Sequence, residues 1–328
     1  MHKYNFAILG TGMIANKMAE ALDSVDGIVK YAVGSRDILK AETFAKKWGI
    51  KKSYGTYEDL ANDPDIDVVY IATPHNLHHD NTLMCLNHGK HVLCEKPMAV
   101  NLKEVEEMIN VAHNKGLFLM EAMWTRFLPS VIKVKELIDG GAIGNVNLLA
   151  ADFCINKKVN PSDRKFNREL IGGSLLDIGI YPIYLSQYLL GLPESYIAVA
   201  GIGETKVDYN CSMTLKYPGI QMAVMHSSFI ADSGVNASVY GSKGTIKFDP
   251  MWFTPVPFTL IDDKGNEKRY EFGFVGNGYN YEVDEVVNCL NKGLIESSMM
   301  SWQHSVDLIK QLDGIREICG IYYPGHDD

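Results

Sequence analysis

The sequence predicts an α/β protein in which an N-terminal, doubly wound parallel sheet precedes a C-terminal α+β domain with a mostly antiparallel, open sheet. Through the first 120 residues, short buried-strand patterns alternate with helical patterns, as in parallel sheets covered by helices. After Gly140-Gly141 the chain changes to runs with two-residue periodicity, which are typical of antiparallel strands. A length of 328 residues suffices for two domains. We place them at residues 1–122 and 123–328, with the C-terminal helix as a candidate to pack back on the first domain.

The first domain contains five short segments that are rich in Val, Ile, Leu and aromatic residues, and we interpret them as buried strands. They are Tyr4–Leu9, Ile28–Val33, Val68–Thr73, His91–Cys94 and Leu117–Glu121. Between them, Thr56 and Asn101 stand where a helix N-cap is expected. Glycines stand where helix C-caps are expected, at Gly49, Gly89 and Gly116. This alternation predicts the parallel sheet.

The second domain is predicted to begin with a long helix and to continue as a sheet. The helix is expected at about Ser174–Leu190. Five strands are expected at Tyr196–Ile202, Cys211–Tyr217, Gln221–Phe229, Val235–Tyr240 and Thr245–Phe248. Two helices, about Tyr281–Lys292 and Gln303–Tyr322, are expected to close the chain. Few helices remain to cover this sheet, so we expect one of its faces to be free for a homodimer.

Composition excludes several classes of protein. A net charge of −9 argues against nucleic acid as a partner, because neutralising phosphates requires a basic surface. No apolar run approaches the roughly 20 residues of a membrane span, so no membrane partner is expected. The six cysteines include no C-x-x-C pair, which is typical of reduced thiols rather than a disulfide framework. With no signal-like segment before the first strand, these observations predict a cytoplasmic protein.

A glycine-rich turn follows the first predicted strand. The pattern Gly10-x-Gly12-x-x-Ala15 lies between that strand and a helix, which is the context in which it indicates dinucleotide binding. Gly10 permits the tight turn, Gly12 lets the backbone approach a pyrophosphate, and Ala15 permits close helix–strand packing. The helix N-terminus then offers free N–H groups to the phosphates. The first domain is therefore predicted to be a Rossmann domain.

The second strand indicates which dinucleotide is preferred. An NAD site usually places an acidic residue at the tip of this strand, but here the tip reads Ser35-Arg36-Asp37. A hydroxyl and a guanidinium suit the 2′-phosphate of NADP, since Arg binds phosphate in a bidentate fork. Asp37 could bind a ribose hydroxyl, but it is also the expected N-cap of the next helix. We therefore predict NADP, with NAD as the alternative.

Two further motifs carry groups suited to hydride-transfer chemistry. Lys96 lies at the end of a predicted strand, where ligands of doubly wound sheets collect, and Pro97 restricts its backbone to extended or turn conformations and admits a cis bond. Asp177 and Tyr181 are four residues apart, so they project from one face of a helix. An acid and a phenol together are what an alcohol/carbonyl redox site needs. Taken singly, these residues are also common as a surface lysine, a capping aspartate and a core tyrosine.

In these motifs the chain resembles the glucose–fructose oxidoreductase/inositol dehydrogenase/MocA (Gfo/Idh/MocA) family, and in particular its NADP-dependent dimeric dihydrodiol dehydrogenases, which also oxidise D-xylose. The resemblance spans nearly the whole chain. It is carried by Gly10–Ala15, Ser35–Asp37, Glu95–Pro97, Glu121–Phe127 and Gly173–Tyr181. Many members of the family carry histidine in place of Tyr181, so the chain resembles the tyrosine branch.

The resemblance implies that Lys96 and Tyr181 are the catalytic pair, with Tyr181 as acid/base. It implies that Trp124, Phe153 and Trp252 line the substrate pocket together with Tyr181 and Asp177, and that Asp177 orients the substrate or replaces Tyr181 as the base. Arg126 is a candidate for cofactor or substrate contact or for a salt bridge. The candidate cofactor-binding residues are Gly10, Gly12, Met13, Ile14, Ser35, Arg36, Thr73, Pro74, His75, His78, Glu95, Lys96 and Arg126.

The charge of Lys96 is large enough in effect to let Tyr181 act as a base near neutral pH. A free tyrosine has a pKa near 10 and needs about three units of help to act as a base near pH 7. An ammonium about 4 Å away contributes on the order of 4 kcal/mol at an effective dielectric constant of 20, which is close to three units. Oxidised nicotinamide adds further positive charge, whereas burial of the phenol opposes the shift.

These observations predict an NADP-dependent oxidoreductase that acts on an aldose, a cyclic polyol or a trans-dihydrodiol. The alternative is a non-catalytic NAD(P)-binding sensor of the same fold, which would have no need to retain both Lys96 and Tyr181. His75 and His79 have the spacing of half a zinc site, but no acid or cysteine completes it at motif spacing. We therefore expect no metal.

Overall fold

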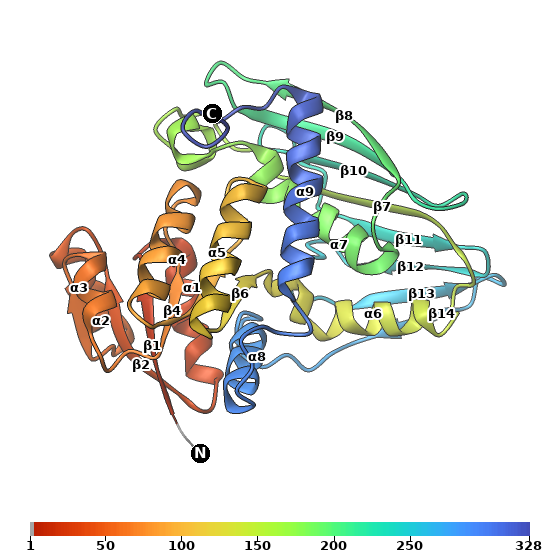
Figure 1. Ribbon diagram of the computed structural model, residues 1–328. Helices are drawn as coiled ribbons and strands as arrows, with labels where there is room; N and C mark the ends of the chain where they lie inside the picture. The colour runs from red at the N-terminus through yellow and green to blue at the C-terminus, as the bar shows by residue number, and fades with distance from the viewer. Residues whose placement is uncertain (1–2) are drawn as a thin grey trace. The chain divides into compact units, whose positions relative to one another are not determined.

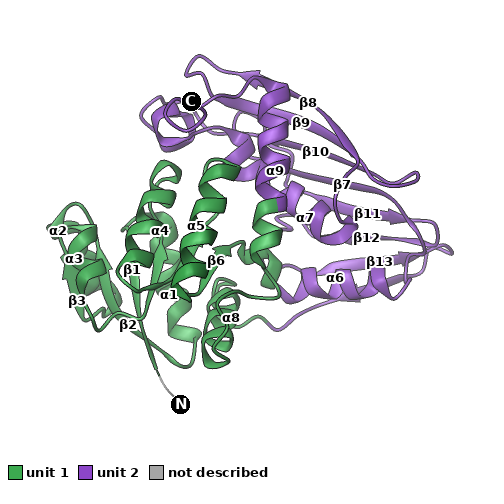
Figure 2. Ribbon diagram, viewed as in Figure 1, with its two compact units in different colours: residues 1–127, 274–306 green, residues 128–273, 307–328 purple. Residues whose placement is uncertain are grey.

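The computed structural model describes residues 3–328 and divides into two compact units. Unit 1 contains residues 1–127 and 274–306, and unit 2 contains residues 128–273 and 307–328 (Figure 2). The first boundary lies five residues beyond the expected one, and residues 274–306 return to unit 1. Residues 274–306 belong to unit 1 because their helix, Asn280–Asn291, packs against residues 22–24 and 124–127 of that unit.

Unit 1 is built on a six-stranded parallel sheet with the order β3-β2-β1-β4-β5-β6 (Figure 1). The strands are β1 Tyr4–Leu9, β2 Ile28–Gly34, β3 Lys52–Tyr54, β4 Val68–Ile71, β5 His91–Glu95 and β6 Leu119–Ala122. The predicted Rossmann-type sheet is therefore confirmed. The short β3 was not predicted, because its three residues include a charged lysine and form no apolar run.

The helices of unit 1 begin and end largely where capping residues predict. They are α1 Met13–Ala21, α2 Ile38–Trp48, α3 Tyr57–Asn62, α4 His78–Asn87, α5 Leu102–Lys115 and α8 Asn280–Asn291. Thr56 and Asn101 accept hydrogen bonds at the N-termini of α3 and α5 from Asp59 N and Glu104 N, respectively. Gly49 and Gly116 close α2 and α5 in the left-handed conformation that C-caps favour.

Unit 2 is built on an eight-stranded sheet with the order β14-β13-β12-β11-β7-β10-β9-β8. The strands are β7 Val146–Cys154, β8 Ser195–Ile202, β9 Asp208–Lys216, β10 Met222–Ser228, β11 Ala237–Gly241, β12 Gly244–Phe248, β13 Phe258–Asp262 and β14 Glu267–Tyr270. The β7–β10 pair is parallel and the other pairs are antiparallel, which confirms the mostly antiparallel sheet.

The helices of unit 2 are α6 Pro129–Asp139 and α7 Ile180–Leu190, and α9 Trp302–Cys319 runs from one unit into the other. A π-helical turn, Leu175–Gly179, leads into α7, so the predicted helix is present but begins with a wider turn. α7 packs on β7 and β10. The opposite face of the sheet exposes alternate apolar residues of β8 and β10, among them Ile197, Val199 and Val224.

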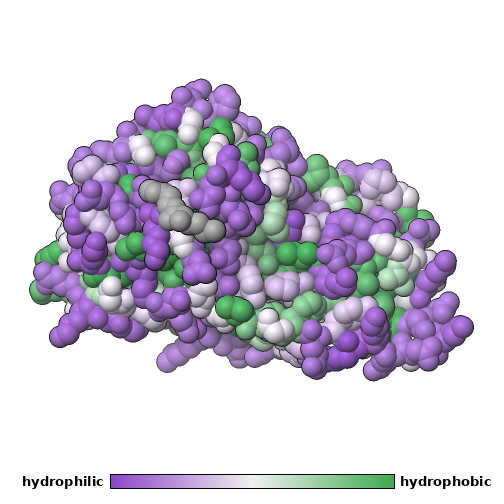
Figure 3. Space-filling model, turned by 90° about the horizontal axis from the view of Figure 1, so that it is seen from below, coloured by the Kyte–Doolittle hydropathy of each residue, from purple (hydrophilic) through white to green (hydrophobic). Residues whose placement is uncertain are grey.

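Across residues 3–328, no helix is both long and apolar enough to cross a bilayer. The face of the molecule in Figure 3 shows hydrophobic residues in small groups between hydrophilic ones.

Candidate active site

The glycine turn joins β1 to α1 and is shaped by close backbone contact. Gly10 has a φ of +118°, and a Cβ there would lie 2.6 Å from the carbonyl oxygen of Ala72. A side chain at Gly12 would meet nothing within 4 Å, and Gly12 caps α1 without a side-chain hydrogen bond. The first N–H groups of α1 thus lie beside open space. This geometry fits the pyrophosphate of a dinucleotide.

Ser35, Arg36 and Asp37 follow β2 at the same carboxyl edge of the sheet. Asp37 is the N-cap of α2, since its carboxylate accepts hydrogen bonds from Leu39 N at 3.0 Å and Lys40 N at 3.4 Å. Ser35 is buried and Arg36 is exposed. The structural role expected for Asp37 is present, which leaves Ser35 and Arg36 as candidates for contact with a ribose phosphate.

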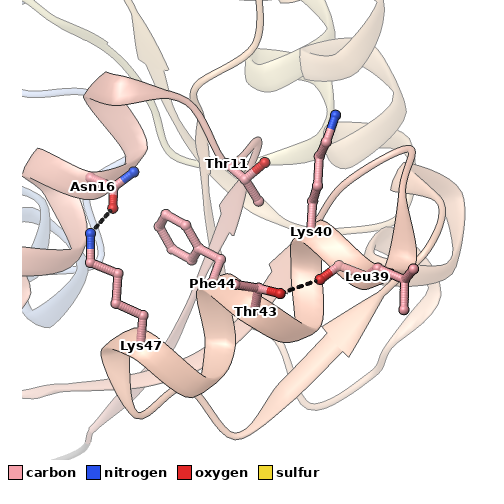
Figure 4. A pocket seen from close by; sticks show the side chains of 7 residues that line it. All are labelled: Thr11, Asn16, Leu39, Lys40, Thr43, Phe44 and Lys47. Atoms are coloured by element: carbon pink, nitrogen blue, oxygen red, sulfur yellow. Dashed lines mark hydrogen bonds between the residues drawn. The ribbon is translucent and has the colours of Figure 1, made fainter.

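A cavity of about 380 Å³ adjoins the glycine turn in unit 1 (Figure 4). It is lined by Thr11, Asn16, Leu39, Lys40, Thr43, Phe44 and Lys47. Lys47 Nζ donates a hydrogen bond to Asn16 Oδ1 at 2.7 Å. In the sequence, Lys40 and Lys47 resemble solvated charges on a helix face, so no motif marks them as lining a cavity. The lining residues come from the glycine turn, α1 and α2.

His78 links the chain segments that follow β4 and β5. Its Nδ1 lies 2.7 Å from the carbonyl oxygen of Pro97, and its Nε2 lies 3.0 Å from that of Thr73. His75 contacts the His78 ring edge-on and is buried, and Pro74 precedes it at the start of a short 3₁₀ turn. Because both nitrogens of His78 face backbone carbonyls, this residue links the two segments.

Lys96 directly follows β5 in a buried position, and its peptide bond to Pro97 is cis. Glu95 accepts a hydrogen bond from Lys96 N at 3.2 Å and a second from the hydroxyl of Tyr70 on β4. On α8, burial and then the charge of Glu95 raise the pKa of Glu282 well above its ordinary value, which favours the neutral form of this carboxyl beside Glu95.

Trp124 and Arg126 follow β6 in a 3₁₀ turn, Trp124–Phe127. Trp124 stacks on Tyr279 with ring centroids 4.1 Å apart and planes inclined by 10°. Arg126 Nε donates to the carbonyl oxygen of Met299 at 2.9 Å, so part of its guanidinium holds the chain segment before α9. Tyr279 was not identified from the sequence, because no motif links it to Trp124.

In unit 2, Tyr181 lies in an aromatic cluster. Its ring centroid is 5.4 Å from that of Phe153 on β7 and 5.3 Å from that of Phe253, and the two phenylalanines stack at 4.1 Å. Trp252 is fully buried, and its Nε1 donates to the carbonyl oxygen of Asp152 at 2.9 Å. The aromatic side chain from this loop that contacts Tyr181 is therefore Phe253, a residue absent from the sequence-based set.

Asp177 lies in the π-helical turn and is paired with Arg164. Nη2 of Arg164 lies 3.2 Å from Oδ1 and 3.1 Å from Oδ2 of the carboxylate. Arg164 stands in a loop with no recognisable motif, so the sequence did not reveal it. The pairing fixes the orientation of the carboxylate, which suits a hydrogen-bond acceptor for a substrate hydroxyl.

The residue types and positions around the glycine turn are matched by known proteins. A model described as "Oxidoreductase family, NAD-binding Rossmann fold" matches residues 4–123, and a GFO/IDH/MocA C-terminal domain model matches residues 131–247. The chain belongs to the Gfo/Idh/MocA family. It is an oxidoreductase with a nicotinamide-dinucleotide-binding domain, of the dehydrogenase/reductase class that acts on CH–OH groups.

Similar proteins cover nearly the full length of this family member. The trans-1,2-dihydrobenzene-1,2-diol dehydrogenase of Xenopus tropicalis is 37% identical, with 97% of this chain and 99% of the relative covered. That of Mus musculus is 38% identical, with 97% and 98% covered. Among solved structures, an aldose–aldose oxidoreductase from Caulobacter crescentus complexed with glycerol is 26% identical, with a TM-score of 0.88 and 97% and 98% of the two chains covered.

A prediction about stability follows from Glu121 on β6. Its Oε1 accepts a hydrogen bond from Met98 N at 2.9 Å, and burial raises its pKa from 4.5 to about 7. The Glu121 carboxyl ionises at lower pH in the unfolded chain than in the folded one. Its stabilising contribution to the free energy of unfolding is therefore complete below about pH 4.5 and is lost as the pH rises through about 7. A shift of this size corresponds to about 3 kcal/mol. In the wild-type protein the free energy of unfolding should therefore fall between about pH 4.5 and 7, and Glu121→Gln should make this fall smaller.

Urea denaturation at a series of pH values measures this effect, with Glu106→Gln on the exposed face of α5 as the matched control. The control should keep the wild-type pH dependence. An unchanged slope in Glu121→Gln would contradict the assignment.

Proposed function

We propose that the protein is an NADP-dependent dehydrogenase that exchanges a hydride with a small polyhydroxylated substrate: an aldose, a cyclic polyol or a trans-dihydrodiol. The observation that carries the proposal is the near full-length similarity to diol dehydrogenases at 37–38% identity. The likeness to an aldose–aldose oxidoreductase with glycerol bound extends the substrate class to sugars and polyols.

The proposed mechanism assigns one task to each group of residues. When bound, NADP⁺ supplies a nicotinamide that accepts the hydride from the substrate carbon. Gly10 and Gly12 hold its pyrophosphate, Ser35 and Arg36 its 2′-phosphate, and the Thr73–His78 and Glu95–Lys96 segments surround its reactive end. The proton of the substrate hydroxyl passes to the phenolate oxygen of Tyr181. Lys96 favours that phenolate through its positive charge.

Aromatic and acidic side chains are proposed to position the substrate. Phe153 and Phe253 pack against Tyr181 and exclude water from its hydroxyl. Asp177, held by Arg164, accepts a hydrogen bond from a second substrate hydroxyl. Because Asp177 is engaged in this pair, we assign orientation to Asp177 and proton transfer to Tyr181. Trp124, whose ring is fixed by Tyr279, provides a further apolar wall in the proposal.

The proposal includes a cytoplasmic homodimer. The six cysteines of the chain are free thiols, which suits a reducing compartment. Ile197 and Val199 on β8 and Val224 on β10 expose apolar surface on one face of the eight-stranded sheet. Burying such a face against a second copy would remove it from water. Sedimentation of the purified protein at twice the monomer mass would agree with this part of the proposal, and a monomer would refute it.

The decisive experiment measures nicotinamide reduction by the purified chain. A panel of aldoses, inositols and trans-dihydrodiols is offered with NADP⁺ and, in parallel, with NAD⁺. Turnover of one class with NADP⁺ is expected. Tight NADP⁺ binding without turnover of any member would instead favour a non-catalytic sensor of the same fold.

The preference for NADP leads to a prediction about Arg36. Arg36→Ala should raise KM for NADP⁺ about ten- to a hundredfold, because charge-assisted hydrogen bonds contribute roughly 1.5–3 kcal/mol each, and should leave KM for NAD⁺ nearly unchanged. Lys40→Ala, which removes a cation from the adjoining cavity, should have a smaller effect in the same direction. Lys46→Ala on the exposed side of α2 is the control. An equal loss with both cofactors would disprove recognition of the 2′-phosphate by Arg36.

A further inference from the structure

The sheet of unit 2 brings together three metal-ligating side chains that the proposed reaction does not use. Within residues 3–328, Asp152, Cys154 and His226 form a group whose carboxylate oxygen, sulfur and ring nitrogen all lie within 4.8 Å of one another. Asp152 and Cys154 are two residues apart on β7, so both point to the same face. His226 on β10 pairs with Asp152 in the parallel ladder and joins them on that face.

Hydrogen bonds hold the carboxylate of Asp152 in this group. The hydroxyl of Ser233 and the backbone N–H of Asn236, the latter at 3.2 Å, both donate to the carboxylate of Asp152. Hydrogen bonds of this kind fix the direction of a ligating oxygen. Asp152 and Cys154 are buried, whereas the side chain of His226 is exposed in the single chain.

Negative charge beside Cys154 favours a cation. Asp152 and Asp232 both act on the sulfur, and a bound divalent ion replaces the thiol proton as its positive partner. Asp232 Oδ1 also accepts a hydrogen bond from Gly234 N at 3.0 Å.

We propose that Asp152, Cys154 and His226 bind a Zn²⁺-class cation, with water or Asp232 in the fourth position. Carboxylate, thiolate and imidazole together form the mixed oxygen, sulfur and nitrogen set that zinc accepts in tetrahedral geometry. To reach the spacing of tetrahedral zinc ligands, the three ligand atoms must approach one another by about 1 Å. A rotation of the exposed His226 side chain can provide this movement. On binding, the Cys154 thiol releases its proton to solvent.

The position of the ion indicates a structural role. Phe153 lies between Asp152 and Cys154 and points to the other face, where it contacts Tyr181 and Phe253. The backbone of Asp152 also accepts the indole N–H of Trp252. A metal ion would therefore stiffen the strand that carries Phe153 without entering the aromatic cluster. The proposal is independent of the identity of the substrate.

The test uses the full-length chain, stripped with a chelator and titrated with Co²⁺ and then Zn²⁺. Thiolate ligation of Co²⁺ should give a near-ultraviolet charge-transfer band that saturates at one ion per chain and disappears when Zn²⁺ displaces the cobalt. Cys154→Ser should lack the band, and His226→Ala should weaken Zn²⁺ binding at least tenfold. Cys319→Ser, which removes a partly exposed thiol outside the group, is the matched control and should keep both properties.

Absence of a band in the wild-type protein would overturn the site. A band in Cys154→Ser as strong as in the wild type, or its loss in Cys319→Ser, would also overturn it. If Cys154→Ser does not fold, His226→Ala decides the question alone, because His226 is exposed and its truncation leaves the core intact. Wild-type Zn²⁺ affinity in that variant would refute the proposal.

Discussion

A Tyr181→Phe variant is expected to lose at least a hundredfold in kcat while its affinity for NADP⁺ changes by less than about twofold. The phenylalanine ring keeps the contacts with Phe153 and Phe253, so the substitution removes only the hydroxyl. Without that oxygen the substrate proton has no acceptor of matched basicity. Steady-state turnover and cofactor titration by fluorescence measure the two quantities separately.

The matched control is Tyr188→Phe on the same helix, which removes a hydroxyl from a tyrosine stacked on Tyr184. It should keep wild-type turnover. Unaltered kcat in Tyr181→Phe would remove the acid/base role from this residue and direct attention to Asp177.

The second large effect is expected for Lys96→Met. An ammonium about 4 Å from the phenol would favour the phenolate by on the order of 4 kcal/mol at an effective dielectric constant of 20. Its removal should lower kcat/KM near pH 7 by two to three orders of magnitude, since about 1.4 kcal/mol corresponds to tenfold. It should also move the acidic limb of the pH profile, where activity rises with pH, to higher pH, because Tyr181 would then ionise only at higher pH.

The pH dependence of kcat/KM for oxidation distinguishes this role from a structural one. Lys96→Arg, which keeps the charge, should restore part of the activity and keep the acidic limb near its wild-type position. Lys103→Met on the exposed side of α5 should change neither property. A Lys96→Met profile that falls in height but does not move along the pH axis would show that Lys96 only positions ligand.

Several parts of the fold could be predicted because their signals are local. β1 runs from Tyr4 to Leu9 as expected, since its apolar residues are contiguous and a glycine turn ends it. Thr56 and Asn101 cap their helices because a side-chain oxygen at that position accepts a backbone N–H whatever the rest of the chain does.

Other elements escaped prediction for identifiable reasons. β7, near the middle of the second sheet, is buried continuously from Ala151 to Cys154, so it lacks the alternation by which the neighbouring strands were found. β13 and β14 are mostly half-buried or exposed and carry a weak apolar pattern. α6 begins with Pro129 at its first turn, a start signal that is separate from the periodicity of apolar residues.

The sequence by itself determined the parallel dinucleotide-binding sheet, the glycine turn, the Lys96-Pro97 segment and the helix that carries Asp177 and Tyr181. These features depend on contacts within a few residues, where hydrogen bonding and side-chain periodicity act directly. Only the tertiary structure decided that Phe253 rather than Trp252 contacts Tyr181, and that Arg164 holds Asp177. It also decided that His226 faces Asp152. Strand register and loop packing bring such residues together, and neither is encoded by the spacing of the residues along the chain.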